Sequence, residues 1–233
     1  MRLMAVFASI MLLAPLVAHG SSQPLPAYTV VTEDFPPYNY QVENQPRGLS
    51  VDVLQAVFDE LYKNKDQKLR PEIQFLPWAR AYHKAQTVEN VLIFSIARIP
   101  EREALFHWIG EIAPYRTSIY KLRRNPIEIS SLRDAREYEV GVSQEDVIYS
   151  FLRSEGFERL DVIGSDLLNI QKLKHQRIPL IAYDEAAFHF AMEKVRDPEA
   201  FERVLRIEPL SGSLYMAFSQ GSDPKLIQAF QAA

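Results

Sequence analysis

Side chains that could bind a small polar molecule follow directly after the strands that the sequence predicts. They are aromatic, basic and acidic, and they occupy residues 35–40, 78–80, 95–102, 143–146 and 184–185. In open parallel sheets a ligand lies beyond the carboxyl ends of the strands, and in two-lobed proteins it lies between the lobes. An arginine fork binds a carboxylate, an aspartate accepts from an ammonium, and aromatic rings supply apolar and cation–π contact. This combination suggests a site for a small zwitterion, although polar residues follow the strands of every α/β protein.

The first half of the chain predicts alternating strands and helices. Apolar or β-rich runs predict strands over residues 28–32, 72–76 and 91–96. The third run, VLIFSI, is apolar almost throughout, as expected of a parallel strand buried on both faces. Helices are predicted after Gly48, where apolar residues recur at 3.6 spacing, after Pro77, and from Pro100. This order predicts a parallel sheet with crossover helices.

The pattern restarts in the second half of the chain. Strands are predicted over residues 138–142, 160–163, 178–183 and 213–219, and helices over 147–152, 166–174, 184–195 and from 223. Two βα lobes, with the late strand returning to the first lobe, fit this order better than one continuous sheet. We expect the first lobe at 21–119, the second at 120–209, and a return to the first lobe, with a short C-terminus, at 210–233.

The composition excludes several classes of protein. Hydrophobic residues make up 47% and aromatic residues 11% of the 233 residues, which is too apolar for a disordered chain. The absence of cysteine excludes disulfides, thiolate metal sites, a cysteine nucleophile and a lipid-modified N-terminal cysteine. A net charge of -4 without a long basic block argues against nucleic acid as a partner. The short basic run 121–124 is predicted to be a solvated connector. The five histidines lack metal-ligand spacing, so neither a metal nor another cofactor is expected.

Residues 1–20 have the features of a cleaved secretory signal. Arg2 precedes an apolar run over 3–17, and the small residues Ala18 and Gly20 stand at the -3 and -1 positions. The run is shorter than the roughly 20 residues of a membrane span and contains a proline. An uncleaved anchor helix is the alternative. We expect an exported, soluble, monomeric protein in the periplasm.

Four short segments of the chain carry a family resemblance. They are TEDFPPY at 32–38, GLSVD at 48–52, SIARIPER at 95–102 and AYDE at 182–185. In this order they resemble the bacterial periplasmic solute-binding proteins of the polar amino-acid type, which feed ABC transporters. The segment PWAR at 77–80 is similar to a short, largely uncharacterised branch of that family. The resemblance implies a two-lobed α/β fold, with parallel or mixed sheets flanked by helices and a ligand cleft between the lobes. It also implies a small polar solute as ligand and an inner-membrane ABC permease as partner.

The resemblance implies roles for individual residues. Arg102 matches the arginine that grips the ligand carboxylate, and Ser95 stands in the loop whose polar groups assist it. Asp184 matches the second-lobe aspartate that takes the ligand ammonium, and Phe35 matches an aromatic that stacks on the ligand. The predicted ligand-binding set is completed by Tyr38, Trp78, Arg98 and Asp146.

Structural roles stay open for several of these residues. Arg102 could form surface ion pairs, Asp184 could cap a helix, and Trp78 could belong to the core. Arg98 is either a second anion clamp or a salt bridge that fixes the loop.

Two departures from the family pattern bear on the ligand. Gln144-Glu145-Asp146 stands where the family has a Gly-Thr whose backbone amides complete the carboxylate site, and acids at a helix start repel a carboxylate. Ala97 replaces a hydroxyl residue. These departures favour an amine, a cationic side chain or another small polar solute over a strict amino-acid pocket.

The predicted function is capture of a small polar solute without catalysis. The first alternative is a periplasmic enzyme on the same scaffold, a cyclohexadienyl or prephenate-type dehydratase. Glu145, Asp146 or Glu185 would then have to serve as its general acid. The second alternative is a ligand sensor that works without a transporter.

Overall fold

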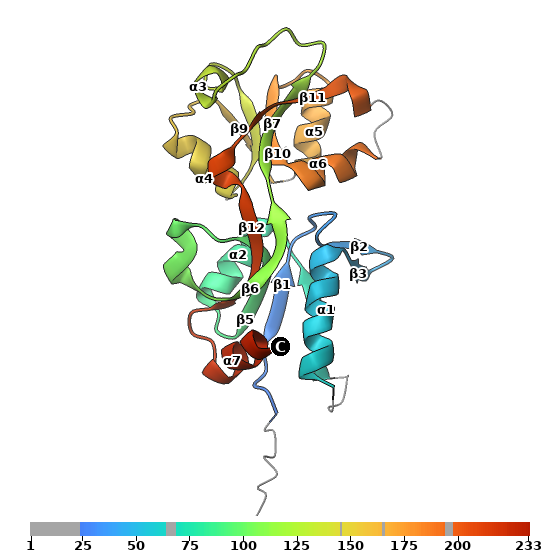
Figure 1. The fold of residues 1–233 in the computed structure, drawn as a ribbon, viewed down its shortest axis with the longest axis vertical. Helices are drawn as coiled ribbons and strands as arrows, with labels where there is room; N and C mark the ends of the chain where they lie inside the picture. Colours follow the sequence, from blue (N-terminus) through green and yellow to red (C-terminus); the bar gives the residue numbers. More distant parts are fainter. Residues whose placement is uncertain (1–23, 64–68, 145, 165, 194–197) are drawn as a thin grey trace, which may run out of the picture.

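Two five-stranded sheets form the centres of two lobes, which are stacked along the long axis of the molecule (Figure 1). The computed structural model describes residues 24–63, 69–144, 146–164, 166–193 and 198–233. Within these ranges, no helix has both the length and the apolar character needed to cross a membrane. The predicted signal segment lies outside the described residues.

The first lobe is built on a sheet with the strand order β4-β1-β5-β12-β6. Its strands are β1 (Thr29–Thr32), β4 (Ile73–Phe75), β5 (Val91–Ala97), β6 (Phe106–Tyr115) and β12 (Gly212–Ser219). The strands β4, β1 and β5 are parallel, and β12 runs antiparallel to both β5 and β6. The strands predicted near the start of the chain are confirmed.

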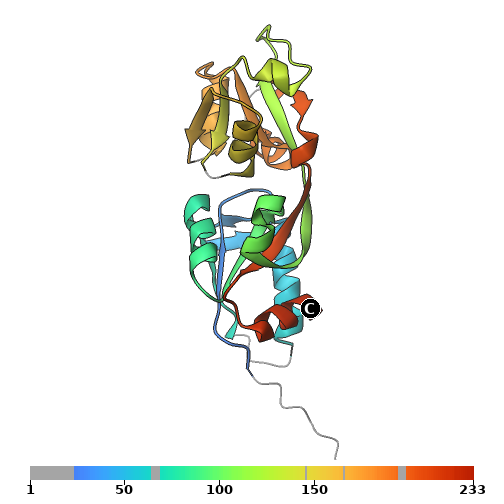
Figure 2. The same ribbon diagram turned by 90° about the vertical axis from the view of Figure 1, so that its left-hand side faces the viewer.

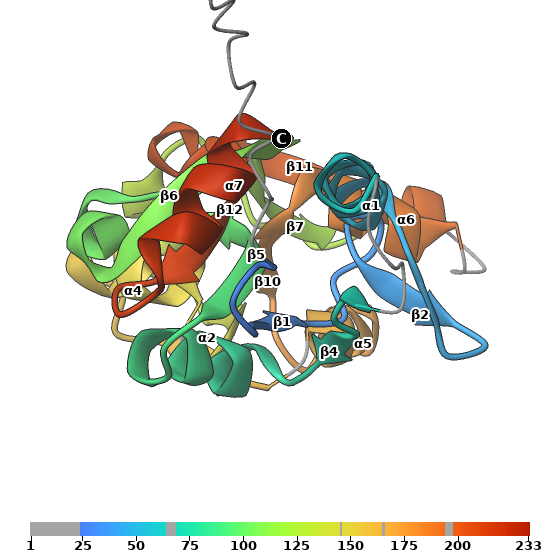
Figure 3. The ribbon, with the colours of Figure 1, turned by 90° about the horizontal axis from the view of Figure 1, so that it is seen from below.

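Helices cover both faces of this first sheet. They are α1 (Leu49–Leu61), α2 (Trp78–Thr87) and α7 (Pro224–Ala232). Seen along the long axis, α1 and α7 lie on one side of β1 and β5, and α2 lies on the other (Figure 3). Buried side chains alternate accordingly, because successive residues of a strand point to opposite faces. Val30 packs into the core with α1 and α7, and Val31 packs into the core with α2.

The second lobe is built on a sheet with the strand order β11-β7-β10-β8-β9. Its strands are β7 (Thr117–Leu122), β8 (Val140–Ser143), β9 (Leu160–Ile163), β10 (Leu180–Asp184) and β11 (Phe201–Arg206). Its helices are α3 (Leu132–Ala135), α4 (Val147–Ser154), α5 (Asp166–Lys174) and α6 (Glu185–Met192). The strands β8, β9 and β10 are parallel, and α5 packs against them. Strand β7 runs antiparallel to β10 and β11. The molecule is therefore a two-lobed α/β protein with mixed sheets flanked by helices, as expected.

Shorter elements complete the described chain. They are the hairpin of β2 (Tyr40–Val42) and β3 (Gln45–Arg47), and the 3-10 helices η2 (Pro100–Leu105), η3 (Pro198–Ala200) and η4 (Glu208–Leu210).

Two short segments join the lobes (Figure 2). In one, β6 runs into β7 through Arg116, and in the other β11 runs into β12 through residues 207–211. The backbone N–H of Ile207 donates to the carbonyl of Thr117 at 2.9 Å, so the two crossings are bonded to each other. Each crossing is only a few residues long, which is the construction expected of a hinge between lobes.

The sequence did not predict β6, β7, β11 or the β2–β3 hairpin. β6 has the sequence FHWIGEIAPY, in which glycine, proline and polar residues interrupt the apolar ones. Such a strand shows neither the continuous apolar run of a buried parallel strand nor a clean alternation, so its periodicity carries little signal.

The expectation that residues 121–124 form a solvated connector is wrong for Lys121. This residue belongs to β7 and is 7% exposed. Its Nζ donates to the carbonyls of Asn125 at 2.9 Å and Ile127 at 2.6 Å, and lies 3.1 Å from Glu202. A buried ammonium needs such partners, because an unpaired charge away from water is costly.

Candidate ligand-binding site

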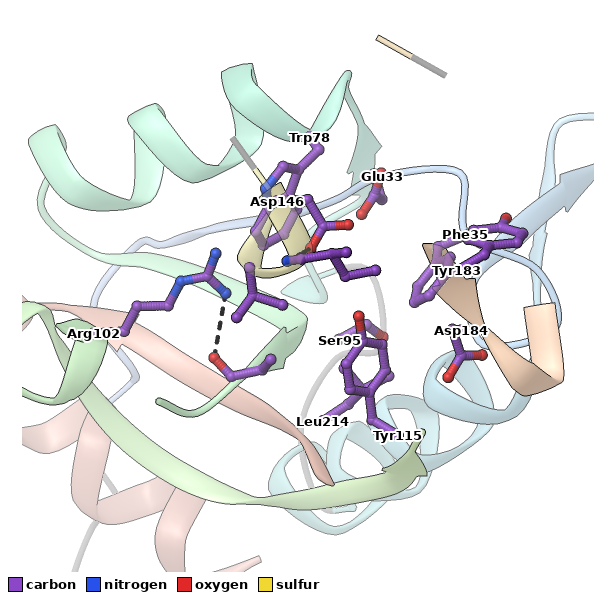
Figure 4. A pocket seen from close by; sticks show the side chains of 13 residues that line it. Glu33, Phe35, Trp78, Ser95, Arg102, Tyr115, Asp146, Tyr183, Asp184 and Leu214 are labelled. Atoms are coloured by element: carbon purple, nitrogen blue, oxygen red, sulfur yellow. Dashed lines mark hydrogen bonds between the residues drawn. The ribbon is translucent and has the colours of Figure 1, made fainter. Parts of the chain in front are cut away.

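A small pocket lies where the carboxyl ends of parallel strands from the two lobes meet (Figure 4). The first lobe contributes Glu33, Phe35, Trp78, Ser95, Ala97, Arg102, Tyr115 and Leu214. The second lobe contributes Asp146, Val147, Ile148, Tyr183 and Asp184. The cavity volume is about 30 Å³, which is room for a water molecule but not for an amino acid. A larger solute reaches this centre only if the lobes move apart.

Two larger cavities adjoin this central pocket. The first, which we call the acidic cavity, has a volume of about 410 Å³ and shares Glu33, Trp78 and Tyr183 with the pocket. The second, which we call the apolar cavity, has a volume of about 560 Å³ and shares Arg102 and Val147 with it. The space between the lobes therefore has two sides of different chemistry, which meet at the central pocket.

Arg102 is held in the central pocket by η2 and by two aromatic rings. The residue is 5% exposed, and its guanidinium carbon lies 4.8 Å from the ring centre of Tyr82 and 5.4 Å from that of Trp78. Its Nη1 donates to the carbonyl of Ala97 at 3.3 Å. Cation–π contact with two rings holds the guanidinium in place, and N–H donors remain for other partners. Arginine binds a carboxylate through such donors.

Asp184 belongs to the second lobe, across the pocket from Arg102. It is the last residue of β10 and caps the N-terminus of α6. Its Oδ1 accepts from the backbone N–H of Ala187 at 2.8 Å and lies 3.1 Å from the hydroxyl of Tyr38, and its Oδ2 accepts from the backbone N–H of Arg116 at 3.1 Å. Burial raises the pKa of Asp184 to about 6, although these hydrogen bonds favour the ionised form. A cation brought into the pocket would favour the ionised carboxylate further.

A bulge in β5 shapes the floor of the central pocket. The pairing of β12 with β5 shifts so that Ile96 and Phe94 face neighbouring residues of β12, and Ser95 is the extra residue between them. Ser95 has a φ of 60°, a left-handed conformation that is unfavourable for a residue with a side chain. Bulges of this kind redirect side chains next to functional sites. Here the bulge places Ser95 on the pocket.

Asn39 anchors this floor to the loop after β1. The Ser95 hydroxyl donates to Oδ1 of Asn39, and Nδ2 of Asn39 donates to Oγ1 of Thr32 at 2.9 Å and to the carbonyl of Glu33 at 2.7 Å. Asn39 is fully buried, and each polar atom of its side chain has a partner. The network fixes the loop that carries Glu33 and Phe35 into the pocket.

Acidic groups outnumber basic ones at the central pocket. Glu33, Asp146 and Asp184 line it, with Arg102 as the one described cation. Burial raises the pKa of Asp146, against the opposing effects of a hydrogen bond from the backbone N–H of Ile148 and of the Arg102 charge. Both aspartates are thus held in surroundings that disfavour their charge, and a ligand cation would relieve this.

The structure brings six of the eight predicted contact residues together in the central pocket: Phe35, Trp78, Ser95, Arg102, Asp146 and Asp184. Tyr38 lies behind the pocket, 3% exposed, with its ring 5.0 Å from that of Phe35 and its hydroxyl on Asp184. It supports the site from behind and does not line it.

Arg98 is the second predicted contact that does not line the pocket. Its Nε donates to Oε2 of Glu103 at 2.9 Å, and its guanidinium lies over the rings of Trp108 and Tyr215, at 5.3 Å and 5.6 Å. Of the two roles that the sequence left open for Arg98, the structure has the salt bridge.

Sequence reasoning missed Glu33, Tyr115 and Tyr183 as parts of the site, and it did not single out Asn39 within the candidate range 35–40. Glu33 and Tyr183 lie at the ends of predicted strands, so their positions carried a usable signal. Tyr115 ends a strand that the sequence did not reveal, and its part in the pocket had no sequence signal.

Two lobes whose parallel strands meet at a shared polar pocket define the class of two-lobed binding proteins. The chain belongs to the bacterial extracellular solute-binding proteins, family 3, whose model matches residues 28–233. No curated protein sequence matches the chain. In the described part of the chain, no group of three or more histidine or acidic side chains is arranged to hold a metal ion.

Several solved structures have a similar fold. A histidine kinase sensor domain with similarity to periplasmic binding proteins has a TM-score of 0.74 at 17% identity, covering 88% of this chain and 87% of that chain. An ancestral arginine-binding protein bound to arginine has a TM-score of 0.73 at 18% identity, covering 88% and 89%. The holo arginine-binding protein from T. maritima has a TM-score of 0.71 at 16% identity, covering 88% of each chain. At these identities the similarity establishes the fold.

Proposed function

We propose that the protein is an exported, non-catalytic solute-binding protein that encloses a small amine-bearing solute between its lobes and presents it to an ABC permease. The observation that carries the proposal is the charge of the central pocket, where Glu33, Asp146 and Asp184 surround one arginine. The adjoining acidic cavity adds Asp34 and has no lysine, arginine or histidine among its described lining residues. Carboxylates gathered in this way favour a ligand that carries positive charge.

Ligand binding requires the lobes to open and then to close at the hinge. With room for about one water in the central pocket, the lobes must separate to admit the solute and close again upon it. Closure brings Arg102 and Trp78 of the first lobe to the same ligand as Asp184 of the second. Binding energy thus shifts an equilibrium between open and closed forms, and the closed form is the one that a permease would read.

A catalytic role for Glu185 receives no support from its surroundings. Its carboxylate accepts from Arg206 at 2.8 Å and 2.9 Å, from Ser118 at 2.6 Å and from Arg203 at 2.8 Å. Burial acts to raise the pKa of Glu185, but these hydrogen bonds outweigh it and bring the pKa to about 2. A general acid must hold a proton near neutral pH, and this carboxylate does not.

Calorimetry on refolded, ligand-stripped protein tests the proposal. The panel contains diamines, basic and neutral amino acids, and organic acids without an amine. We expect an amine-bearing compound to bind, and Asp184→Asn to weaken it by about 2 kcal/mol or more, roughly 30-fold. The matched control is Asp161→Asn, which removes the same charge from the same lobe but whose carboxylate pairs with Lys172 at 2.6 Å, away from the pocket. Binding confined to organic acids, or equal losses in both variants, would refute the amine site.

Export and transport need separate tests. We expect cell fractionation to recover the protein in the periplasm without residues 1–20, and uptake of the identified solute to fall when the protein is removed. Binding without any effect on uptake would favour the sensor alternative.

A further inference from the structure

The apolar cavity is a second space between the lobes that the amine site does not use. It has a volume of about 560 Å³ and lies between η2 of the first lobe, α4 of the second and the η4 segment of the hinge. The segments η2 and α4 face each other across the boundary of the lobes (Figure 2). Arg102 and Val147 separate this cavity from the central pocket, since both line each of the two spaces.

The walls of the apolar cavity suit an apolar body. Tyr82 comes from the first lobe, Tyr149 and Phe151 come from α4, and Leu210 closes the hinge side. Aromatic and aliphatic walls around a space of several hundred cubic ångströms are typical of sites for small organic molecules. The acidic cavity, by contrast, contains Glu33 and Asp34, so the two cavities differ in the ligands they favour.

One buried charge lies at the inner end of the apolar cavity. The guanidinium of Arg102 makes cation–π contacts with Trp78 and Tyr82, and among the described residues its one hydrogen-bond acceptor is the carbonyl of Ala97. A guanidinium has five N–H donors, so further donors remain for a carboxylate. At the outer rim stands Glu101, which is exposed and would repel a second carboxylate.

We propose that the apolar cavity is a second binding site, for a small monocarboxylic acid with an aromatic or aliphatic body. The carboxylate pairs with the Arg102 edge, and the body lies among Tyr82, Tyr149 and Phe151. Because the site is built from both lobes and the hinge segment, an occupant acts on the same closure as the amine site. Glu101 disfavours dicarboxylates. Amines are disfavoured because, unlike the central pocket, this cavity has no aspartate among its described lining residues to offset the charge of Arg102.

The test uses 3-phenylpropanoate as the probe and its neutral analogue, 3-phenylpropanamide, as the control ligand, both measured by calorimetry. Two matched variants fill one cavity each. Ser154→Trp places an indole in the apolar cavity, from an exposed position on α4. Leu167→Trp enlarges an exposed side chain in the acidic cavity.

We expect the wild type to bind 3-phenylpropanoate and the amide to bind on the order of tenfold more weakly or not at all. Ser154→Trp should weaken the acid by on the order of tenfold or more, while Leu167→Trp leaves it unchanged. No binding of the acid to the wild type, equal binding of acid and amide, or unchanged binding in Ser154→Trp would each overturn the second site. The amine panel is scored separately, so a failure of the amine site and a failure of the second site are distinguishable.

Discussion

The hydroxyl of Tyr38 lies 3.1 Å from Oδ1 of Asp184 and 3.0 Å from the carbonyl of Pro114, so one side chain of the first lobe touches both the second lobe and the strand that leads to it. When Asp184 is ionised, the single Tyr38 proton is shared between two acceptors. When Asp184 is protonated, it can donate to the Tyr38 oxygen, which frees the tyrosine proton for Pro114. The protonation of the pocket is therefore coupled to a contact between the lobes.

The affinity for an amine ligand should rise with pH through about 6. The pKa of Asp184 is raised to about 6 by burial, whereas an amine stays charged over this range. Only the ionised carboxylate pairs with the ammonium, and its fraction climbs from about 0.1 at pH 5 to about 0.9 at pH 7, which makes the affinity roughly tenfold higher at pH 7. Calorimetry at both pH values measures this change in affinity. An amine affinity independent of pH would contradict the pairing with Asp184.

The unliganded protein should show the opposite trend in stability. An acid whose pKa is raised in the folded state stabilises that state fully below its ordinary pKa, and this contribution is lost as the pH rises through the folded value. The contribution of Asp184 should therefore lower the Tm of the free protein as the pH rises from 4 to about 6.

Tyr38→Phe should move the pH midpoint of amine binding upwards. The substitution removes a donor that favours the ionised Asp184, while the ring keeps its contact with Phe35 at 5.0 Å. One hydrogen bond to a charged group contributes about 1.5–3 kcal/mol, so the pKa should rise by about 1 unit or more. A pH series of binding isotherms gives the midpoint. A midpoint that stays in place or falls would show that Tyr38 does not tune the carboxylate.

Arg102→Ala and Arg98→Ala should differ sharply for any ligand that carries a carboxylate. Arg102 is buried in the pocket, and removing one partner of a buried charge pair costs about 2–5 kcal/mol of binding. Arg98 pairs with the exposed Glu103 outside the pocket, where such pairs contribute about 0–1 kcal/mol to stability. A ligand with amines alone should bind Arg102→Ala more tightly than the wild type, because a repelling charge is gone. Similar losses in both variants would count against the assignment of Arg102.

Gly48→Ala should destabilise the protein and weaken ligand binding together. Gly48 has a φ of 115°, and a Cβ there would lie 2.4 Å from the carbonyl oxygen of Tyr38 and 2.6 Å from that of Pro37. The loop behind the pocket must then move, at about 1–3 kcal/mol, which lowers Tm by roughly 2–12 °C. Gly110→Ala is the matched control, because nothing lies within 4 Å of its added Cβ. Calorimetric melts that rank the two variants equally would contradict this reading of Gly48.

Lys121→Met should lower stability without altering the pocket. The ammonium is buried beside Asn125 and Ile127 carbonyls and Glu202, and its loss leaves these acceptors unpaired at about 2 kcal/mol. Arg123→Met removes the other partner of Glu202, at 3.4 Å, but from an exposed position, and should cost less than about 1 kcal/mol. Denaturant unfolding compares the two variants. A larger loss of stability in Arg123→Met than in Lys121→Met would contradict this prediction, because it would show that Glu202 depends more on the exposed Arg123 than on the buried Lys121.

The parallel strands and the residues after them could be predicted from the sequence. A continuous apolar run such as VLIFSI predicts a strand because a parallel strand that is buried on both faces needs apolar side chains at successive positions. Ligand contacts follow such strands, so the positions of Phe35, Ser95 and Asp184 along the chain made them candidates, and the family resemblance supplied their expected roles. The excess of acids near the second-lobe helix start also indicated that a cation suits the site.

Tertiary structure decided which arginine lies in the central pocket. Arg98 and Arg102 are the same residue type in one short segment, and the 3-10 helix η2 turns Arg102 inward while Arg98 stays outside with Glu103. No periodicity describes such irregular backbone, so spacing alone could not rank the two, whereas the family resemblance favoured Arg102 and left the role of Arg98 open. The bulge at Ser95 and the strand that ends at Tyr115 are further cases.

The burial of Lys121 shows the same limit. A basic run suggests solvent, yet Glu202 and two carbonyls from outside β7 make burial of the ammonium favourable. By itself, the sequence determined the buried parallel strands, the longer helices and the chemical types gathered at the strand ends, since burial and local propensity act along the chain. Only the tertiary structure decided which of these side chains share one pocket, because pairing, bulges and buried charges depend on partners that are distant in sequence.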